Sequence, residues 1–145
     1  AEVNRIEQGR DYGWPFCFGT GVNDPQYPQE VGFCKNQAES PILELAAHVK
    51  PRGLVKIPQE FSSELADLWI VSYAGTEETI VPQGYKLVLV DPAKQVTQGQ
   101  NMITGWLESD GTVWGQPTDL VMIDNSQLII ADSSAGVIYQ VTITR

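Results

Sequence analysis

Short runs of β-branched and aromatic residues, separated by turn-forming residues, dominate the chain after residue 50. Residues 68–73 (LWIVSY) and 85–90 (YKLVLV) are typical of strands, because such side chains favour a half-buried pleated surface. Glycine and an Asp-Pro pair bound these runs, which predicts two neighbouring antiparallel strands. Residues 53–57 and 101–107 extend the pattern on either side, so we expect a four-stranded antiparallel sheet.

The same layout returns near the end of the chain. Residues 117–123, 127–131 and 136–144 repeat the first three strands, with turn residues between them. Repetition of a four-stranded unit favours a β-propeller over a sandwich. The predicted fold class is therefore all-β, a partial propeller of about two four-stranded antiparallel blades.

The chain is predicted to be a single domain by its length of 145 residues. We expect it to be arranged as an N-terminal strand and cysteine-bridged loop (1–40), a first blade (41–110) and a second blade (111–145).

The second blade lacks an outer strand in this pattern. Residues 1–8 have a plausible strand pattern in Val3 and Ile6, and we expect them to pair with residues 136–144, either within one chain or by exchange with a neighbouring chain. Two blades cannot close a ring, and open strand edges invite association. The sequence therefore predicts a homo-oligomer, either a dimer or a trimer.

The charge is strongly acidic, with a net charge of −9 at pH 7 and a pI near 4.4. Such a chain repels nucleic-acid phosphates and acidic membrane surfaces. No apolar run approaches the roughly 20 residues of a membrane span, and no charged-then-apolar signal segment opens the chain. We expect neutral, cationic or protein partners.

Cys17 and Cys34 are the only cysteines, and the loop between them is rich in Gly, Pro, Asn and Asp. A disulfide is the simplest interpretation, and it implies an oxidising compartment, the periplasm or the cell exterior. The alternative is a pair of buried free thiols in a cytosolic protein. A metal site is a poorer interpretation, because two sulfurs with no nearby histidine fall short of four ligands.

Several short motifs occur in a specific order along the chain. They are Asn4-Arg5-Ile6, Asp11-Tyr12-Gly13-Trp14-Pro15, Pro51-Arg52-Gly53-Leu54, Gly84-Tyr85-Lys86, Thr104-Gly105-Trp106, Trp114-Gly115-Gln116-Pro117 and Ala131-Asp132. In this order the chain resembles the C-terminal part of the soluble glucose/sorbosone dehydrogenases, which use pyrroloquinoline quinone (PQQ). The resemblance implies a six-bladed β-propeller.

Two departures from that family bear on activity. The catalytic histidine of the family lies in an earlier blade, which has no counterpart in this chain. Where the family commonly has Trp-Asn-Arg, this chain has Glu77-Glu78-Thr79, which places acidic groups where the carboxylates of PQQ need cations. We therefore predict no catalytic residue and no cofactor for this chain alone, with PQQ and calcium expected only if the dehydrogenase interpretation holds.

The candidate ligand-binding residues are chosen by residue type and position. Arg52 and Lys56 are cations on the first predicted inner strand, His48 is the only histidine, and Asp132 follows a strand that points towards the propeller mouth. Trp114 is the aromatic residue expected to be most exposed, and Tyr73 ends a strand. His48 also has a purely structural interpretation, Asp132 that of a turn anchor, and the aromatic residues that of core packing. No metal ligand is assigned.

Two functions follow from these observations. The first is a non-catalytic or vestigial propeller module that binds a neutral small molecule, a sugar or a protein. The second is part of a PQQ-dependent sugar dehydrogenase that oxidises an aldose.

Overall fold

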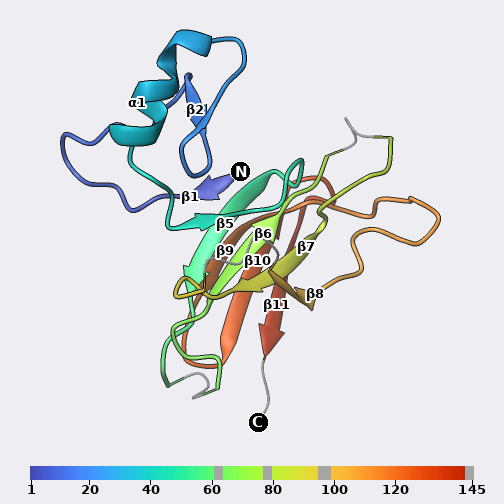
Figure 1. The fold of residues 1–145 in the computed structure, drawn as a ribbon. Coiled ribbons are helices and arrows are strands. Elements are labelled where there is room, and N and C mark those ends of the chain that lie inside the picture. The colour runs from blue at the N-terminus through green and yellow to red at the C-terminus, as the bar shows by residue number, and fades with distance from the viewer. Residues whose placement is uncertain (61–63, 77–79, 95–98, 143–145) are drawn as a thin grey trace.

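The computed structural model describes the whole chain except residues 61–63, 77–79, 95–98 and 143–145. Two antiparallel sheets stack on one another, and a small disulfide-bonded segment lies to one side of them (Figure 1). Glu77-Glu78-Thr79, which the sequence predicts to place acidic groups near a bound PQQ, lies outside the described residues.

The first blade is the four-stranded sheet predicted from the sequence. Its strand order is β5-β6-β7-β8, with bounds β5 (Pro51–Lys56), β6 (Trp69–Tyr73), β7 (Lys86–Val90) and β8 (Gln100–Ile103). Each strand pairs antiparallel with the next one in sequence. This is the up-and-down order of a propeller blade.

The second blade has three strands in the order β11-β10-β9. Their bounds are β9 (Pro117–Met122), β10 (Gln127–Asp132) and β11 (Val137–Thr142), close to the predicted ranges. The predicted all-β fold with partial blades is confirmed, and no described residue forms a fourth strand beside β11.

Apolar side chains on both faces of the first blade account for its continuous hydrophobic runs. Ile70 and Leu87 point towards the second blade and pack with Leu120, Leu128 and Ile130. The alternate residues of the same strands face the other way and form a separate cluster: Val71, Tyr73, Val88 and Val90 with Leu43, Leu45 and Val49. Burial on both faces removes the polar alternation that a half-exposed strand shows.

The N-terminal strand does not pair as predicted. β1 (Glu2–Val3) pairs antiparallel with β4 (Leu43–Glu44), so the expected pairing of residues 1–8 with the last strand of the same chain is wrong. Val3 packs beside the cluster that Leu43 helps to form on the first blade. The segment before the blade therefore covers an apolar face and holds β1 there.

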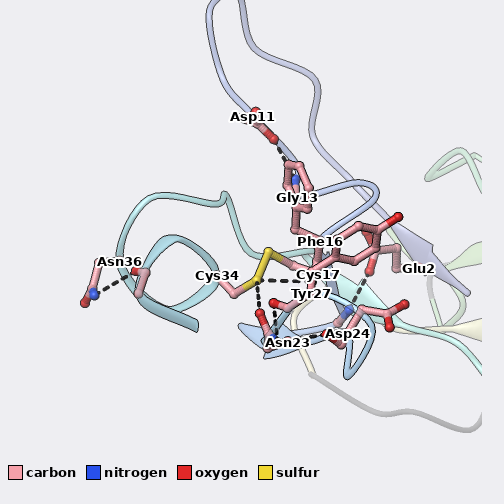
Figure 2. Close-up of a disulfide and its surroundings, with 12 residues drawn as sticks. Glu2, Asp11, Gly13, Phe16, Cys17, Asn23, Asp24, Tyr27, Cys34 and Asn36 are labelled. Carbon is pink, nitrogen blue, oxygen red and sulfur yellow. Dashed lines mark hydrogen bonds between the residues drawn. A yellow bond between two sulfur atoms is a disulfide. The ribbon is translucent and has the colours of Figure 1, made fainter. Parts of the chain in front are cut away.

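The cysteines form the predicted disulfide, with 2.07 Å between the sulfurs of Cys17 and Cys34 (Figure 2). The bridge joins the hairpin of β2 (Cys17–Phe18) and β3 (Val22–Asn23) to a helix α1 (Val31–Asn36), which follows a 3-10 turn η1 (Pro28–Glu30). Sequence analysis did not anticipate this helix. Pro25 and Pro28 precede this helix and Gly32 lies within it, and these residues mask a six-residue helix in the sequence.

Two carboxylates attach the disulfide segment to the β1–β4 ribbon. Glu2 accepts a hydrogen bond from the Gly19 amide at 3.0 Å, and Glu44 accepts one from the Thr20 amide at 2.8 Å. Glu2 and Glu44 are direct cross-strand partners, so both reach the same turn. No helix among the described residues is long and apolar enough to cross a membrane.

Candidate functional site

The two blades meet along their inner strands, β5 and β9, and one buried serine joins them. The hydroxyl of Ser72 accepts a hydrogen bond from the Gly53 amide at 2.7 Å and donates one to the Thr118 carbonyl at 3.0 Å. Gly53 permits this approach, because a Cβ there would lie 2.9 Å from the Leu120 nitrogen. The start of each inner strand is therefore fixed relative to the other.

A cavity of about 430 Å³ opens at this junction. It lies where β5 and β9 begin and where β6 and β10 end, an end of the sheets that we call the mouth. Its lining residues are Lys50, Arg52, Ala74, Gly75, Gln116, Thr118 and Ser133. Both blades therefore contribute polar groups to one wall.

The described lining of the mouth carries two cations although the chain is acidic. Lys50 and Arg52 line it, and no carboxylate is among the described lining residues, whereas the whole chain carries a net charge of −9. Arg52 is exposed and makes no ion pair with any residue in the described part of the chain. The local chemistry favours an anion.

The backbone before β5 takes an uncommon course. His48 and Lys50 have positive φ angles of 58° and 45°, a region that side chains other than glycine rarely occupy. Val49 between them is buried in the cluster on the first blade. This turn presents Lys50 to the mouth, and strained backbone of this kind gathers at functional sites.

Among the predicted cations, the structure places only Arg52 at the mouth. Lys56 lies at the opposite end of β5, where its ammonium forms an ion pair with Asp67 at 2.6 Å. His48 is exposed and does not line the cavity. The strand direction separates Arg52 from Lys56, and Lys56 is not among the described residues that line the mouth.

Asp132 is a buried anchor of the mouth. Its carboxylate accepts hydrogen bonds from the Trp106 indole at 2.9 Å and from the amides of Gln116 and Ala135, both at 2.8 Å. Only 3% of the residue is exposed. Burial raises the pKa of this carboxyl, but these donors together outweigh burial and lower the pKa below its ordinary value. Asp132 holds the Gln116 amide in place and is not among the described residues that line the cavity.

The remaining two candidates lie outside the mouth. Tyr73 is 2% exposed on the far face of the first blade, where burial raises the pKa of its hydroxyl more than the nearby Ala46 backbone lowers it. It lines a different cavity, of about 580 Å³. Trp114 is 66% exposed and lines a third cavity, between the blades. The six candidates therefore do not form one site.

Sequence reasoning missed the four polar mouth residues other than Arg52, which are Lys50, Gln116, Thr118 and Ser133. The sequence carries a signal for two of these residues. Lys50 and Gln116 directly precede Pro51 and Pro117, the prolines that begin the two inner strands. Equivalent positions in a repeat come together at one end of neighbouring blades. Among the described residues, no three His, Cys, Asp or Glu side chains converge as metal ligands would.

Similar proteins identify the kind of fold. No protein-family model matches the chain. An uncharacterized protein of Borreliella burgdorferi is 27% identical over 150 residues, which cover 97% of this chain and 38% of that protein. The chain thus spans well under half the length of this relative.

Solved structures agree on the architecture. The PQQ domain of pyranose dehydrogenase from Coprinopsis cinerea, in its holo form, matches with a TM-score of 0.70 and 18% identity over 90% of this chain and 40% of that one. A Trichoderma reesei carbohydrate-active enzyme of family AA12 matches with a TM-score of 0.68 and 18% identity, over 92% and 39%. At such identity the likeness shows the fold alone: part of a β-propeller like those of PQQ domains.

Proposed function

We propose that this chain is a non-catalytic propeller module that binds a small carboxylate-bearing molecule at its mouth. The observation that carries the proposal is the cationic cavity between β5 and β9, lined by Lys50 and Arg52 in a protein of net charge −9. The proposal replaces the neutral ligand expected from the sequence with an anionic one, because the two charged side chains among the described lining residues are cations.

The chemistry of the mouth suits carboxylate oxygens. A guanidinium can donate two parallel hydrogen bonds to one carboxylate, and an ammonium adds a point charge. Thr118 and Ser133 add hydroxyls and Gln116 adds an amide on the facing blade. A ligand bearing two or more carboxylates can therefore contact both blades at once.

PQQ is the second candidate ligand, and it fits this chain in part. Its carboxylates match Lys50 and Arg52, which would hold and orient it; bound PQQ would supply a hydride acceptor for sugar oxidation. No carboxylate is among the described residues that line the mouth to complement calcium, and His48 lies outside the cavity. These observations favour ligand binding without turnover by this chain.

The disulfide supports a place for the protein in an oxidising compartment, the periplasm or the cell exterior. Small carboxylates and sugars are accessible there. The proposal needs no nucleic acid or membrane partner.

Calorimetric titration of the purified protein with PQQ, and separately with citrate, tests the mouth. We expect saturable binding that the Arg52→Ala variant weakens by about tenfold or more, since a charge-assisted hydrogen bond contributes about 1.5–3 kcal/mol. Lys56→Ala, on the same strand but paired with Asp67, should bind as the wild type does. Equal affinity of the wild type and the Arg52 variant would refute the site.

A turnover assay distinguishes the non-catalytic binding module from the PQQ-dependent dehydrogenase. With PQQ, calcium and glucose present, we expect no dye reduction above that of free PQQ, even where PQQ binds. Dye reduction that depends on Arg52 would establish the dehydrogenase interpretation instead.

A further inference from the structure

The outer edge of the second blade is open and apolar. β11 is the edge strand of its sheet, and most of its residues are exposed, with Val137 43%, Ile138 74% and Tyr139 38% accessible. The equivalent strand of the first blade, β7, is covered by β8. In the described part of the chain nothing takes the place of β8 beside β11.

A cavity of about 320 Å³ lies beside this edge, between the two blades. Ile103, Trp106 and Trp114 line it from the first blade and its connection, and Ile130, Tyr139 and Val141 line it from the second. The edge-to-face contact of Trp106 with Tyr139, 5.8 Å between ring centres, fixes one wall. A strand added to β11 would place apolar side chains against this cavity.

The chain's own N-terminal strand cannot fill this position, because β1 is hydrogen-bonded to β4 on the far side of the first blade. Natural proteins protect open edges with charged residues, prolines or bulges. β11, with the sequence VIYQVT, has no charge and no proline, and its pairing with β10 has no bulge.

The charge distribution indicates what covers the edge. The chain has 18 acidic residues, but none lies between residues 133 and 145. Two copies of this acidic protein would repel each other over most of their surfaces, and this edge is where they can approach without opposed carboxylates. An uncharged strand is also compatible with its own copy in any antiparallel register.

We propose that two copies of the chain associate through β11, pairing antiparallel across a two-fold axis to form one continuous sheet with three strands from each copy. Antiparallel pairing keeps the blade-facing side chains of both strands on one side of the sheet. The β11 side chains of the second copy then face the cavity lined by Trp106 and Trp114. The interface does not depend on the ligand at the mouth.

Light scattering after size exclusion, over a range of protein concentrations, tests this interface. We expect the wild type to be a dimer and Ile138→Lys to raise the dimer dissociation constant at least tenfold, because a two-fold axis brings two added lysines together at the edge. Val121→Lys is the matched control: Val121 lies on the same face of the blade, 53% exposed, but on the inner strand β9. It should remain a dimer.

Three results would overturn the proposal. A wild-type monomer at every concentration shows that the edge is not self-complementary. If the dimers of both variants dissociate to the same extent, the contact lies on the face of the blade and not at its edge. If neither dimer dissociates, the contact lies on another surface of the protein. Circular dichroism confirms that each variant is folded, which the exposure of both side chains favours.

Discussion

Asp132 shows how one buried carboxylate organises the second blade. It accepts hydrogen bonds from the Trp106 indole and from backbone amides on both sides of β10, including that of Gln116 at the mouth. A carboxylate that is buried and fully engaged in this way is costly to replace, because its donors lose their acceptor.

We predict that Asp132→Asn lowers the unfolding free energy at pH 7 by about 3 kcal/mol, from the lost charge-assisted hydrogen bonds. The folded state lowers the pKa of this carboxyl, so its stabilisation is present above the ordinary value of 3.8 and is lost as the pH falls through the folded pKa. Urea unfolding between pH 7 and pH 3 should therefore show a smaller pH dependence in the variant.

Asp124→Asn is the control for this experiment. Asp124 also has a lowered pKa, mainly from the Ser126 amide, but it lies exposed in a turn. A loss of stability as large as that of Asp132→Asn would contradict the role given to the buried network.

Gly53 is a second residue whose identity the fold requires. We predict that Gly53→Ala destabilises the protein by about 1–3 kcal/mol, because its Cβ would press on β9 at 3.0 Å or less. Gly32→Ala, in α1 and with no atom within 4 Å of the added Cβ, should be neutral or slightly stabilising. Thermal unfolding of both variants measures the difference; equal midpoints would show that the inner strands can separate freely.

At the level of elements, the disulfide segment and the blades are held by different interactions. The bridge closes a loop of 17 residues and should contribute about 3 kcal/mol by restricting the unfolded segment. Neither cysteine belongs to the hydrophobic clusters of the blades.

We predict that the double variant Cys17→Ala with Cys34→Ala exposes residues 1–40 to rapid hydrogen exchange while β5–β11 keep their protection. Mass spectrometry of peptic peptides reads both regions in one experiment. Loss of protection in the blades as well would show that the disulfide segment is part of the same cooperative unit.

The strands were predictable because their signal is local. β6 and β10 differ from their predicted ranges by a single residue, since alternation and turn residues mark their ends. The partner of β1 was not predictable, because two residues with a plausible strand pattern fit any open edge. β1 pairs with β4 because apolar side chains of residues 43–49 are buried against the first blade. That burial is determined by the tertiary fold and not by the local sequence.

The same reasoning applies to the mouth. Arg52 was identified as a cation on an inner strand, and the structure places it in the cavity. Lys56 is four residues further along the same strand, and the sequence alone does not say which end of the strand meets the second blade. Thr118 and Ser133 carry no signal in the sequence, and Gln116 carries only its place before a strand-initial proline. They become site residues because Ser72 and Asp132 bring the blades into this register.

At the scale of the whole molecule, the chain provides two neighbouring blades and spans about two-fifths of the PQQ-domain propellers that it matches, with coverage of 38–40%. Its first blade is covered on the outside by residues 43–49, and in the described part of the chain no strand pairs with the apolar edge of its second blade. The mouth lies between the two blades, so ligand binding and the packing of β5 on β9 are expected to be coupled.

The most direct test of this account is the chemical-shift change of backbone amides in a nitrogen-15-labelled sample on addition of PQQ. We predict that the largest changes map to Lys50, Arg52, Thr118 and Ser133, on both blades at the mouth, and that they saturate. Changes confined to the cavity beside β11, or no saturable change with either PQQ or citrate, would contradict the claim that the junction of the inner strands is a carboxylate-binding site.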